Sequence, residues 1–183
     1  FHTNGGIYHW DKTLIEGLDC LDPKVRVLDQ SRIGPILTGD RQDLGDGPPV
    51  TALLIQNTNP MSVAPDLNRV HEGFAREDLF VCVHEQFMTE TAQVADIVLP
   101  ATMFLEHDDL YQAGGHQHIT LGPKIINPPE ECRSNHEVIC ALAKRLDANH
   151  AGFDMSPREL IDRTLCDSGW GNLENLEEKR WID

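Results

Sequence analysis

The chain has 183 residues, of which 40% are hydrophobic and 25% charged, and its formal net charge is −15 at pH 7. This length suits one domain with extensions, and no apolar run approaches the roughly 18 residues that a membrane span needs. The 15 basic residues are outnumbered by 30 acidic ones, so the chain lacks the basic clusters that neutralise a nucleic-acid backbone. The composition therefore excludes a membrane-spanning protein and argues against a nucleic-acid partner.

Five cysteines are scattered along the chain without a C-x-x-C pair, and no secretory hydrophobic segment opens it. Reduced thiols in the cytoplasm are the simplest interpretation, although a piece of an exported, periplasmic parent would look the same. The chain begins at Phe1 without an initiator methionine. We therefore expect a segment cut from the interior of a longer polypeptide.

The first fifty residues are irregular, because Gly and Pro break every run, and only 12–18 suggests a short helix. The apolar run at 50–56 then predicts a strand buried on both faces, as in a parallel sheet. Apolar residues at helical spacing predict a helix at 66–76. The sequence thus places a strand and a helix on either side of the polar turn Asn57-Thr58-Asn59-Pro60.

The same alternation continues with a strand at 78–85, a short helix at 89–95 and a strand at 96–101. Strand, helix, strand, helix, strand at this spacing is typical of an α/β fold with a mainly parallel sheet. We expect a Rossmann-like, three-layer domain in which the loops at 57–60, 84–91 and 101–109 converge at one edge.

The turn Asn57-Thr58-Asn59-Pro60 lies where ligands bind in open α/β sheets, outside the carboxyl end of a strand. Backbone N–H groups there could hold a diphosphate. A plain turn is the alternative, because the chain has no G-x-G-x-x-G and no Walker A lysine. Glu85 follows the second strand, where it could accept hydrogen bonds from ribose hydroxyls or simply be an exposed loop acid. Thr89 and Thr91 could contact a ligand or cap a helix.

Two histidine-containing stretches, His107-Asp108-Asp109 and His116-x-His118, have side chains that bind divalent metals. Neither has a helical H-E-x-x-H or a nearby cysteine partner, so we interpret them as solvated loop residues. Cys132, His136 and Cys140 are spaced by four, but the first precedes the predicted helix, which favours structural cysteines. No nucleophile, general acid or general base is legible.

Two more amphipathic helices are predicted in the last third of the chain. One follows the candidate caps Ser134 and Asn135, with Glu137 near the capping-box position. The other is expected at 157–166, and an acidic, weakly patterned tail follows it.

Three stretches taken together resemble the molybdopterin oxidoreductase family, which includes dimethyl sulfoxide reductase, formate dehydrogenase and periplasmic nitrate reductase. They are "ALLIQNTNPMSVAPDLNRVHEGF", "EDLFVCVHEQFMTETAQVADIVLPATMFLEHDDLY" and "GPKIINPPEECRSNHEVICALAKRLD". The most specific part is "FMTETAQVADIVLP" at 87–100, followed by "FLE" at 104–106. The resemblance covers about residues 25–146.

The resemblance implies a domain that holds one guanine dinucleotide of a molybdenum or tungsten bis-molybdopterin guanine dinucleotide cofactor. In the full-length parent that cofactor would serve two-electron redox chemistry or oxygen-atom transfer. The positions that match the family's cofactor-side motifs are Asn57, Thr58, Asn59, Pro60, Glu85, Thr89, Thr91, Asp96, Glu106, His107 and Asp108.

The chain departs from the family pattern at two of these positions. Asn57 stands where the family usually has Gly, and Glu85 stands where many members have Asp. An iron–sulfur cysteine motif, the metal's protein ligand and the carboxy-terminal domain have no match here. The resemblance therefore implies that this chain alone neither binds the complete cofactor nor turns over substrate, and that any iron–sulfur cluster lies upstream.

We accordingly divide the chain into an irregular leading segment at 1–24, a cofactor-binding α/β domain at 25–146 and a helical tail at 147–183. Its expected partners are the remaining domains of the parent and an electron-transfer protein. Two alternatives stay open: a free-standing nicotinamide- or flavin-binding Rossmann-like protein, and a non-catalytic interaction domain.

Overall fold

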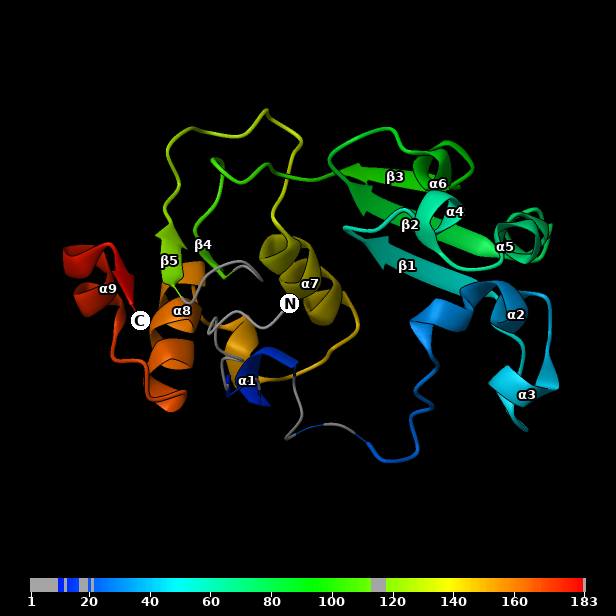
Figure 1. Cartoon of the computed structure of the whole chain (residues 1–183), viewed down its shortest axis with the longest axis horizontal. Helices are drawn as coiled ribbons and strands as arrows, with labels where there is room; N and C mark the ends of the chain where they lie inside the picture. Colours follow the sequence, from blue (N-terminus) through cyan, green and yellow to red (C-terminus); the bar gives the residue numbers. More distant parts are fainter. Residues whose placement is uncertain (1–9, 12, 17–19, 21, 113–117, 183) are drawn as a thin grey trace. The chain divides into compact units, whose positions relative to one another are not determined.

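The computed structural model describes residues 10–11, 13–16, 20, 22–112 and 118–182 (Figure 1). These residues form two compact units. Unit 2 is Asp22–Ala101, and unit 1 combines the described residues before Asp22 with those from Thr102 onward. Each unit has its own sheet and its own core.

Unit 2 is built on a parallel sheet of strands β1 (Ala52–Gln56), β2 (Phe80–Glu85) and β3 (Ile97–Pro100), in that order. Ile55 pairs with Val83, and Val83 pairs with Val98. All three strands were predicted within two residues, and the expected α/β class with a mainly parallel sheet is confirmed. The carboxyl ends of the strands form one edge, which we call the strand-end edge.

Four short helices pack on one face of this sheet: α2 (Ile33–Leu37), α4 (Pro60–Val63), α5 (Leu67–Phe74) and α6 (Glu90–Gln93) (Figure 1). Two more, η1 (Gln30–Arg32) and α3 (Arg41–Leu44), contact α2. The core beneath them includes Leu37, Ile55, Val70 and Val83, all at most 6% exposed. Burying such apolar side chains is the main favourable contribution to folding.

Helices α2 and α5 approach each other closely through two glycines. A Cβ added at Gly34 would lie 2.9 Å from the backbone nitrogen of Val70, and one added at Gly73 would lie 2.5 Å from Cβ of Leu37. Both glycines are buried. Their missing side chains therefore allow the two helix backbones to touch.

The opposite face of the sheet carries Leu54, Phe80 and Ile97, which are 46%, 47% and 45% exposed. Side chains alternate between the two faces along a strand, and parallel sheets are usually covered on both. The third layer and the Rossmann-like detail therefore stay predictions.

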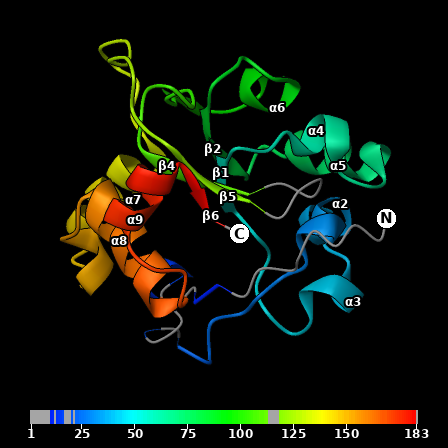
Figure 2. The same ribbon diagram turned by 60° about the vertical axis from the view of Figure 1, so that its left-hand side comes forward.

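Unit 1 contains an antiparallel sheet of β4 (Asp109–Tyr111), β5 (Ile119–Gly122) and β6 (Trp181–Ile182). Its helices are α1 (Thr13–Glu16), α7 (Asn135–Arg145), η2 (Ala151–Phe153), α8 (Pro157–Asp167) and α9 (Leu173–Lys179). Helices α8 and α9 pack beside this sheet (Figure 2). Its core joins Ile161, Leu165, Leu173 and Leu176 to Trp10 and Trp170.

The predicted capping box is confirmed, because Ser134 accepts a hydrogen bond from the N–H of Glu137 while the Glu137 carboxylate accepts from the Ser134 backbone. A second capping box, Ser156 with Glu159, opens α8. The antiparallel sheet and the helices α2, α3, α4 and α9 were not predicted. Along the chain, the boundary between the two compact units falls after Ala101, inside the predicted 25–146 domain, so the predicted domain boundaries stay a prediction.

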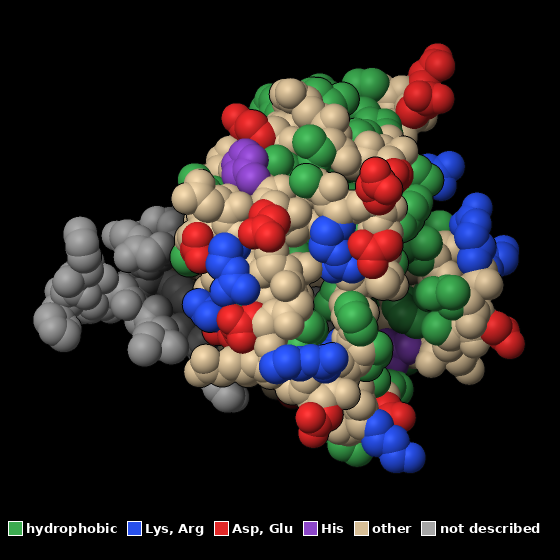
Figure 3. All heavy atoms as spheres, turned by 90° about the vertical axis from the view of Figure 1, so that its right-hand side faces the viewer, with side chains coloured by type: hydrophobic (Ala, Val, Ile, Leu, Met, Phe, Trp, Pro, Cys, Tyr) green, Lys and Arg blue, Asp and Glu red, His purple; other side chains and the backbone are tan. Residues whose placement is uncertain are grey.

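Figure 3 shows basic and acidic side chains lying side by side on the face of the molecule that it presents. The ion pairs of unit 2 include Arg32 with Asp43, Arg69 with Asp40, and Arg76 with Asp78. The shortest of these three N–O distances is 2.6 Å, between Arg76 and Asp78, and the hydrogen bond from Arg76 lowers the pKa of Asp78.

Within the described residues, no helix is long and apolar enough to cross a membrane.

Candidate functional site

Two of the loops expected to converge do so at the strand-end edge of unit 2. The turn after β1 and the loop after β2 are joined by hydrogen bonds between residues about 30 positions apart. The third segment, 102–109, belongs to unit 1, so its place beside the other two stays a prediction. The joined loops form the candidate site.

Asn59 and Thr91 form the centre of this junction. Asn59 Oδ1 accepts hydrogen bonds from the Thr91 hydroxyl at 2.7 Å and from the Thr91 N–H at 3.2 Å. The Thr91 hydroxyl oxygen in turn accepts from the N–H of Met61 at 3.2 Å. Thr91 is completely buried, so its side chain serves the fold and has no open path to a ligand.

Glu90 completes the junction. Its Oε2 accepts a hydrogen bond from Asn59 Nδ2 at 2.7 Å. This hydrogen bond is the main reason that the pKa of Glu90 is lowered. Hydrogen bonds from the Glu90 backbone and from the Ser62 side chain lower it further. We call the group Asn59, Met61, Glu90 and Thr91 the loop clasp.

Two further residues that were predicted to contact the cofactor, Thr89 and Asp96, also accept hydrogen bonds from within the protein. Thr89 caps α6 by accepting a hydrogen bond from the N–H of Ala92 at 3.2 Å, which is the capping role that its sequence position left open. Asp96 Oδ2 accepts from the N–H of Val81 at 2.7 Å, which fastens the start of β3 to β2. Neither side chain needs a ligand to explain its position.

Asn57 adopts a left-handed backbone conformation, with φ of 54°. Gly populates this region without steric cost, and Asn is among the few other residues that enter it routinely. The turn therefore has the same backbone requirement whether Gly or Asn fills the position. Asn57 therefore meets the backbone requirement of a position where the family usually has Gly.

Replacing Asn57 by valine is expected to destabilise unit 2 by about 1–2 kcal/mol, because a β-branched residue is strained at positive φ, whereas Asn57→Gly should change stability by less than about 0.5 kcal/mol. Urea unfolding of both variants measures the difference. Equal stability of the valine and glycine variants would contradict the left-handed assignment.

Several groups at this edge remain available to a ligand. Among the described residues, no protein acceptor is found for the N–H groups of Thr58 and Asn59. Pro60 is buried and opens α4, which fixes the turn. Glu85 is half-buried, and one of its carboxylate oxygens accepts from the N–H of Gln86 at 2.7 Å. The edge thus offers N–H donors beside a carboxylate.

The remaining predicted residues, Glu106, His107 and Asp108, lie in unit 1. Glu106 closes a turn by accepting from the N–H of Met103 at 2.8 Å. His107 Nδ1 lies 2.7 Å from the Thr102 hydroxyl. Asp108 Oδ1 lies 3.1 Å from the N–H of Lys124 and 3.3 Å from the Arg158 guanidinium. All three side chains therefore have structural partners.

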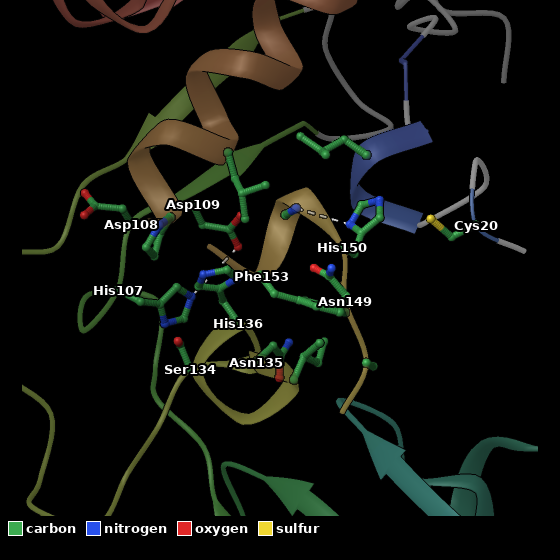
Figure 4. Close-up of a pocket in the computed structure, with 16 residues that line it drawn as sticks. Cys20, His107, Asp108, Asp109, Ser134, Asn135, His136, Asn149, His150 and Phe153 are labelled. Carbon is green, nitrogen blue, oxygen red and sulfur yellow. Dashed lines mark hydrogen bonds and ion pairs between the residues drawn. The ribbon is translucent and has the colours of Figure 1, made fainter. Parts of the chain in front are cut away.

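His107 and Asp108 line a cavity of about 630 Å³ within unit 1. Figure 4 shows His136 and His150 entering the same space from α7 and from the segment before η2. His136 Nε2 lies 2.8 Å from the Met155 carbonyl oxygen, and His150 Nδ1 accepts from the N–H of Gly152. These rings are thus oriented by the backbone around them.

Among the residues that the structure describes, no group of three His, Cys, Asp or Glu side chains is placed to hold a metal ion. His118 packs against Trp181, and His116 lies outside the described residues. Cys140 sits 3.6 Å from the His136 ring on the same helix, and none of the cysteines in the described part of the chain forms a disulfide. Burial raises the pKa of the Cys140 thiol, which suits a structural cysteine.

Comparison with known proteins agrees with this architecture. The family model for molybdopterin oxidoreductase matches residues 43–145, more than half of the chain. The chain belongs to the molybdopterin oxidoreductase family. The matched segment includes the whole parallel sheet, the loop clasp and α7.

Individual relatives of this molybdopterin oxidoreductase segment are much longer. The chain is 37% identical over 88% of its length to probable oxidoreductase YoaE of Bacillus subtilis, of which it spans 23%. It is 33% identical over 52% of its length to the periplasmic nitrate reductase of Desulfovibrio desulfuricans, of which it spans 13%. The acetylene hydratase of Pelobacter acetylenicus has a similar fold, with a TM-score of 0.63 over 80% of this chain and 20% of that one, at 22% identity.

The sequence interpretation missed one buried polar pair beside the site. His84 is completely buried at the end of β2, and its Nδ1 lies 3.2 Å from Gln56 Nε2 on the neighbouring strand. Gln56 is the last residue of β1, His84 is the next-to-last residue of β2, and the two stand directly opposite each other. Two polar residues closing adjacent apolar runs are a signal that could have indicated the pair.

Proposed function

We propose that this chain holds one guanine dinucleotide of a molybdenum or tungsten bis-molybdopterin guanine dinucleotide cofactor, at the strand-end edge of unit 2. The observation that carries the proposal is the loop clasp, which joins two loops at the carboxyl ends of adjacent parallel strands. Ligands of open α/β sheets bind in this position. Membership of the molybdopterin oxidoreductase family supports the choice of ligand.

The chemistry of the edge fits a nucleotide. The N–H groups of Thr58 and Asn59 are suited to phosphate oxygens, since they lie in a turn that opens a helix. The Glu85 carboxylate is suited to ribose hydroxyls. Asn57, which is exposed and has a left-handed backbone conformation, would contact the ligand directly. Asn59 and Thr91 would act indirectly, because their hydrogen bond joins the two loops that form the site.

In the full-length parent, the bound cofactor would supply two-electron redox or oxygen-atom-transfer chemistry. The residues of this chain would bind and orient it. The chain spans 23% or less of the length of the two curated relatives described above. The rest of the cofactor site would therefore come from the remaining domains of the parent polypeptide, and an electron-transfer protein would be a separate partner. The chain alone is accordingly expected to be inactive. The parent protein could work in the cytoplasm or in the periplasm.

A titration of the isotope-labelled chain with GDP and, separately, ADP tests the proposal through backbone amide shifts. We expect shifts at 57–60 and 84–91, with GDP stronger than ADP, and an affinity near millimolar because the pterin contacts are missing. A preference for ADP would replace the proposal with a nicotinamide or flavin protein. Absence of shifts from both nucleotides in the folded chain would overturn it.

A matched pair of variants sharpens this test. Glu85→Gln removes the carboxylate charge proposed to accept ribose hydroxyls, and should weaken GDP binding about threefold to tenfold. Glu77→Gln makes the same chemical change at an exposed residue before β2 and should leave binding unchanged. Equal effects of the two substitutions would remove Glu85 from the site.

A further inference from the structure

The Thr91 hydroxyl uses its hydrogen-bonding capacity to connect the two loops of the strand-end edge. It donates to Asn59 Oδ1 at 2.7 Å and accepts from the N–H of Met61 at 3.2 Å. Both partners belong to the loop and helix that follow β1, whereas Thr91 belongs to the helix that follows β2. A single buried hydroxyl therefore ties the turn at 57–60 to its neighbour.

The other clasp bonds also run between these two segments. Asn59 Oδ1 accepts from the N–H of Thr91, and Asn59 Nδ2 donates to Glu90. Helix α4 has only four residues, so its own hydrogen bonds contribute little to holding the turn. Contacts to the α6 segment therefore help to hold the turn that contains Thr58, together with the bond from the Asn57 N–H to the His84 carbonyl oxygen at 3.4 Å.

We propose that Thr91 is a positioning residue, whose hydroxyl holds the 57–60 turn in its nucleotide-binding conformation through Asn59 and Met61. This inference rests on the proposed function. It assigns to Thr91 a role different from direct contact with the cofactor, since the side chain is fully buried and both of its hydrogen-bonding partners lie within the protein.

Thr91→Val tests the inference, because valine has nearly the shape of threonine and carries a methyl group in place of the hydroxyl. We expect GDP to bind about tenfold more weakly, which is the effect of losing one or two hydrogen bonds that hold the site. In the chain without nucleotide, exchange of the Met61 amide hydrogen should accelerate by about tenfold or more, since that N–H loses its acceptor. Thr91→Ser keeps the hydroxyl and should restore both values.

A control separates positioning from general destabilisation. Val70→Ala removes buried volume from α5 while leaving every clasp residue in place. It should lower the stability of unit 2 without changing GDP affinity or selectively accelerating exchange at Met61. If Thr91→Val does not fold, Asn59→Ala removes the acceptor of the Thr91 hydroxyl while the Met61 N–H keeps its own acceptor. GDP should then also bind about tenfold more weakly, and unchanged GDP affinity would overturn the positioning role.

The possible outcomes distinguish this inference from the function on which it rests. Weaker GDP binding by Thr91→Val with unchanged Met61 exchange would mean direct contact with the ligand, and would overturn the positioning role. Unchanged binding and exchange would overturn it as well. Failure of the unsubstituted chain to bind GDP would instead refute the proposed function, while faster Met61 exchange in Thr91→Val would still support the clasp.

Discussion

Leu37→Ala is expected to destabilise unit 2 by about 2–5 kcal/mol, the range for truncating a buried leucine. Leu37 is 1% exposed at the end of α2 and belongs to the core cluster that contains Val70 and Val83. The loss combines the transfer free energy of the removed carbons with the cavity they leave. It is a large share of the total stability of about 5–15 kcal/mol that is typical of a domain.

Urea unfolding followed through the backbone amide signals of β1 and β2 measures this loss. Tryptophan fluorescence is unsuited to it, because Trp10, Trp170 and Trp181 all belong to unit 1. Leu67→Ala provides the control, since Leu67 is 41% exposed on α5 and should cost less than about 1 kcal/mol. Similar losses from the two substitutions would contradict the assignment of Leu37 to the core.

The parallel sheet was predictable because its signals are local. Each of the three strands is an apolar run bounded by polar or turn residues, and the run at 50–56 ends at Asn57, whose backbone then turns. The capping box of Ser134 and Glu137 was predictable for the same reason, since its partners are three residues apart.

The loop clasp could not be derived in this way. Asn59 and Thr91 are 32 residues apart, and each residue type is also common in turns and helix caps. Only the pairing of β1 with β2 brings their side chains within hydrogen-bonding distance. The sequence therefore indicated these residues as important but suggested contact with the cofactor, whereas the structure joins them to each other.

Long-range pairing also explains the missed sheet of unit 1. Strand β6 has two residues, too few for a periodic pattern, and Ile182 pairs with Ile119 from more than 60 positions away. Helices α2 and α3 were missed because Gly34, Pro35 and Gly39 suggest a broken loop. In the structure, Gly34 and Pro35 are buried within α2, where packing outweighs their low helix propensity.

Gly73→Val is expected to destabilise unit 2 by about 3 kcal/mol, through overpacking against α2. The nearest atom to an added Cβ at this position is Cβ of Leu37, at 2.5 Å, and that atom cannot rotate away without moving the backbone of α2. Gly73→Ala should cost less, because its single methyl group is smaller and alanine gains up to about 1 kcal/mol of helix propensity over glycine. Chemical denaturation of both variants tests this order.

Glu72→Val, at the exposed neighbouring position of α5, is the matched control and should change stability by no more than about 0.5 kcal/mol. The clash also predicts the stability of a double variant in which Gly73→Val is combined with Leu37→Ala. Because alanine retains Cβ, Leu37→Ala should not rescue Gly73→Val fully, even though it creates a cavity nearby. Complete rescue would mean that the outer part of the Leu37 side chain, and not the approach of the α2 and α5 backbones, determines the requirement for glycine.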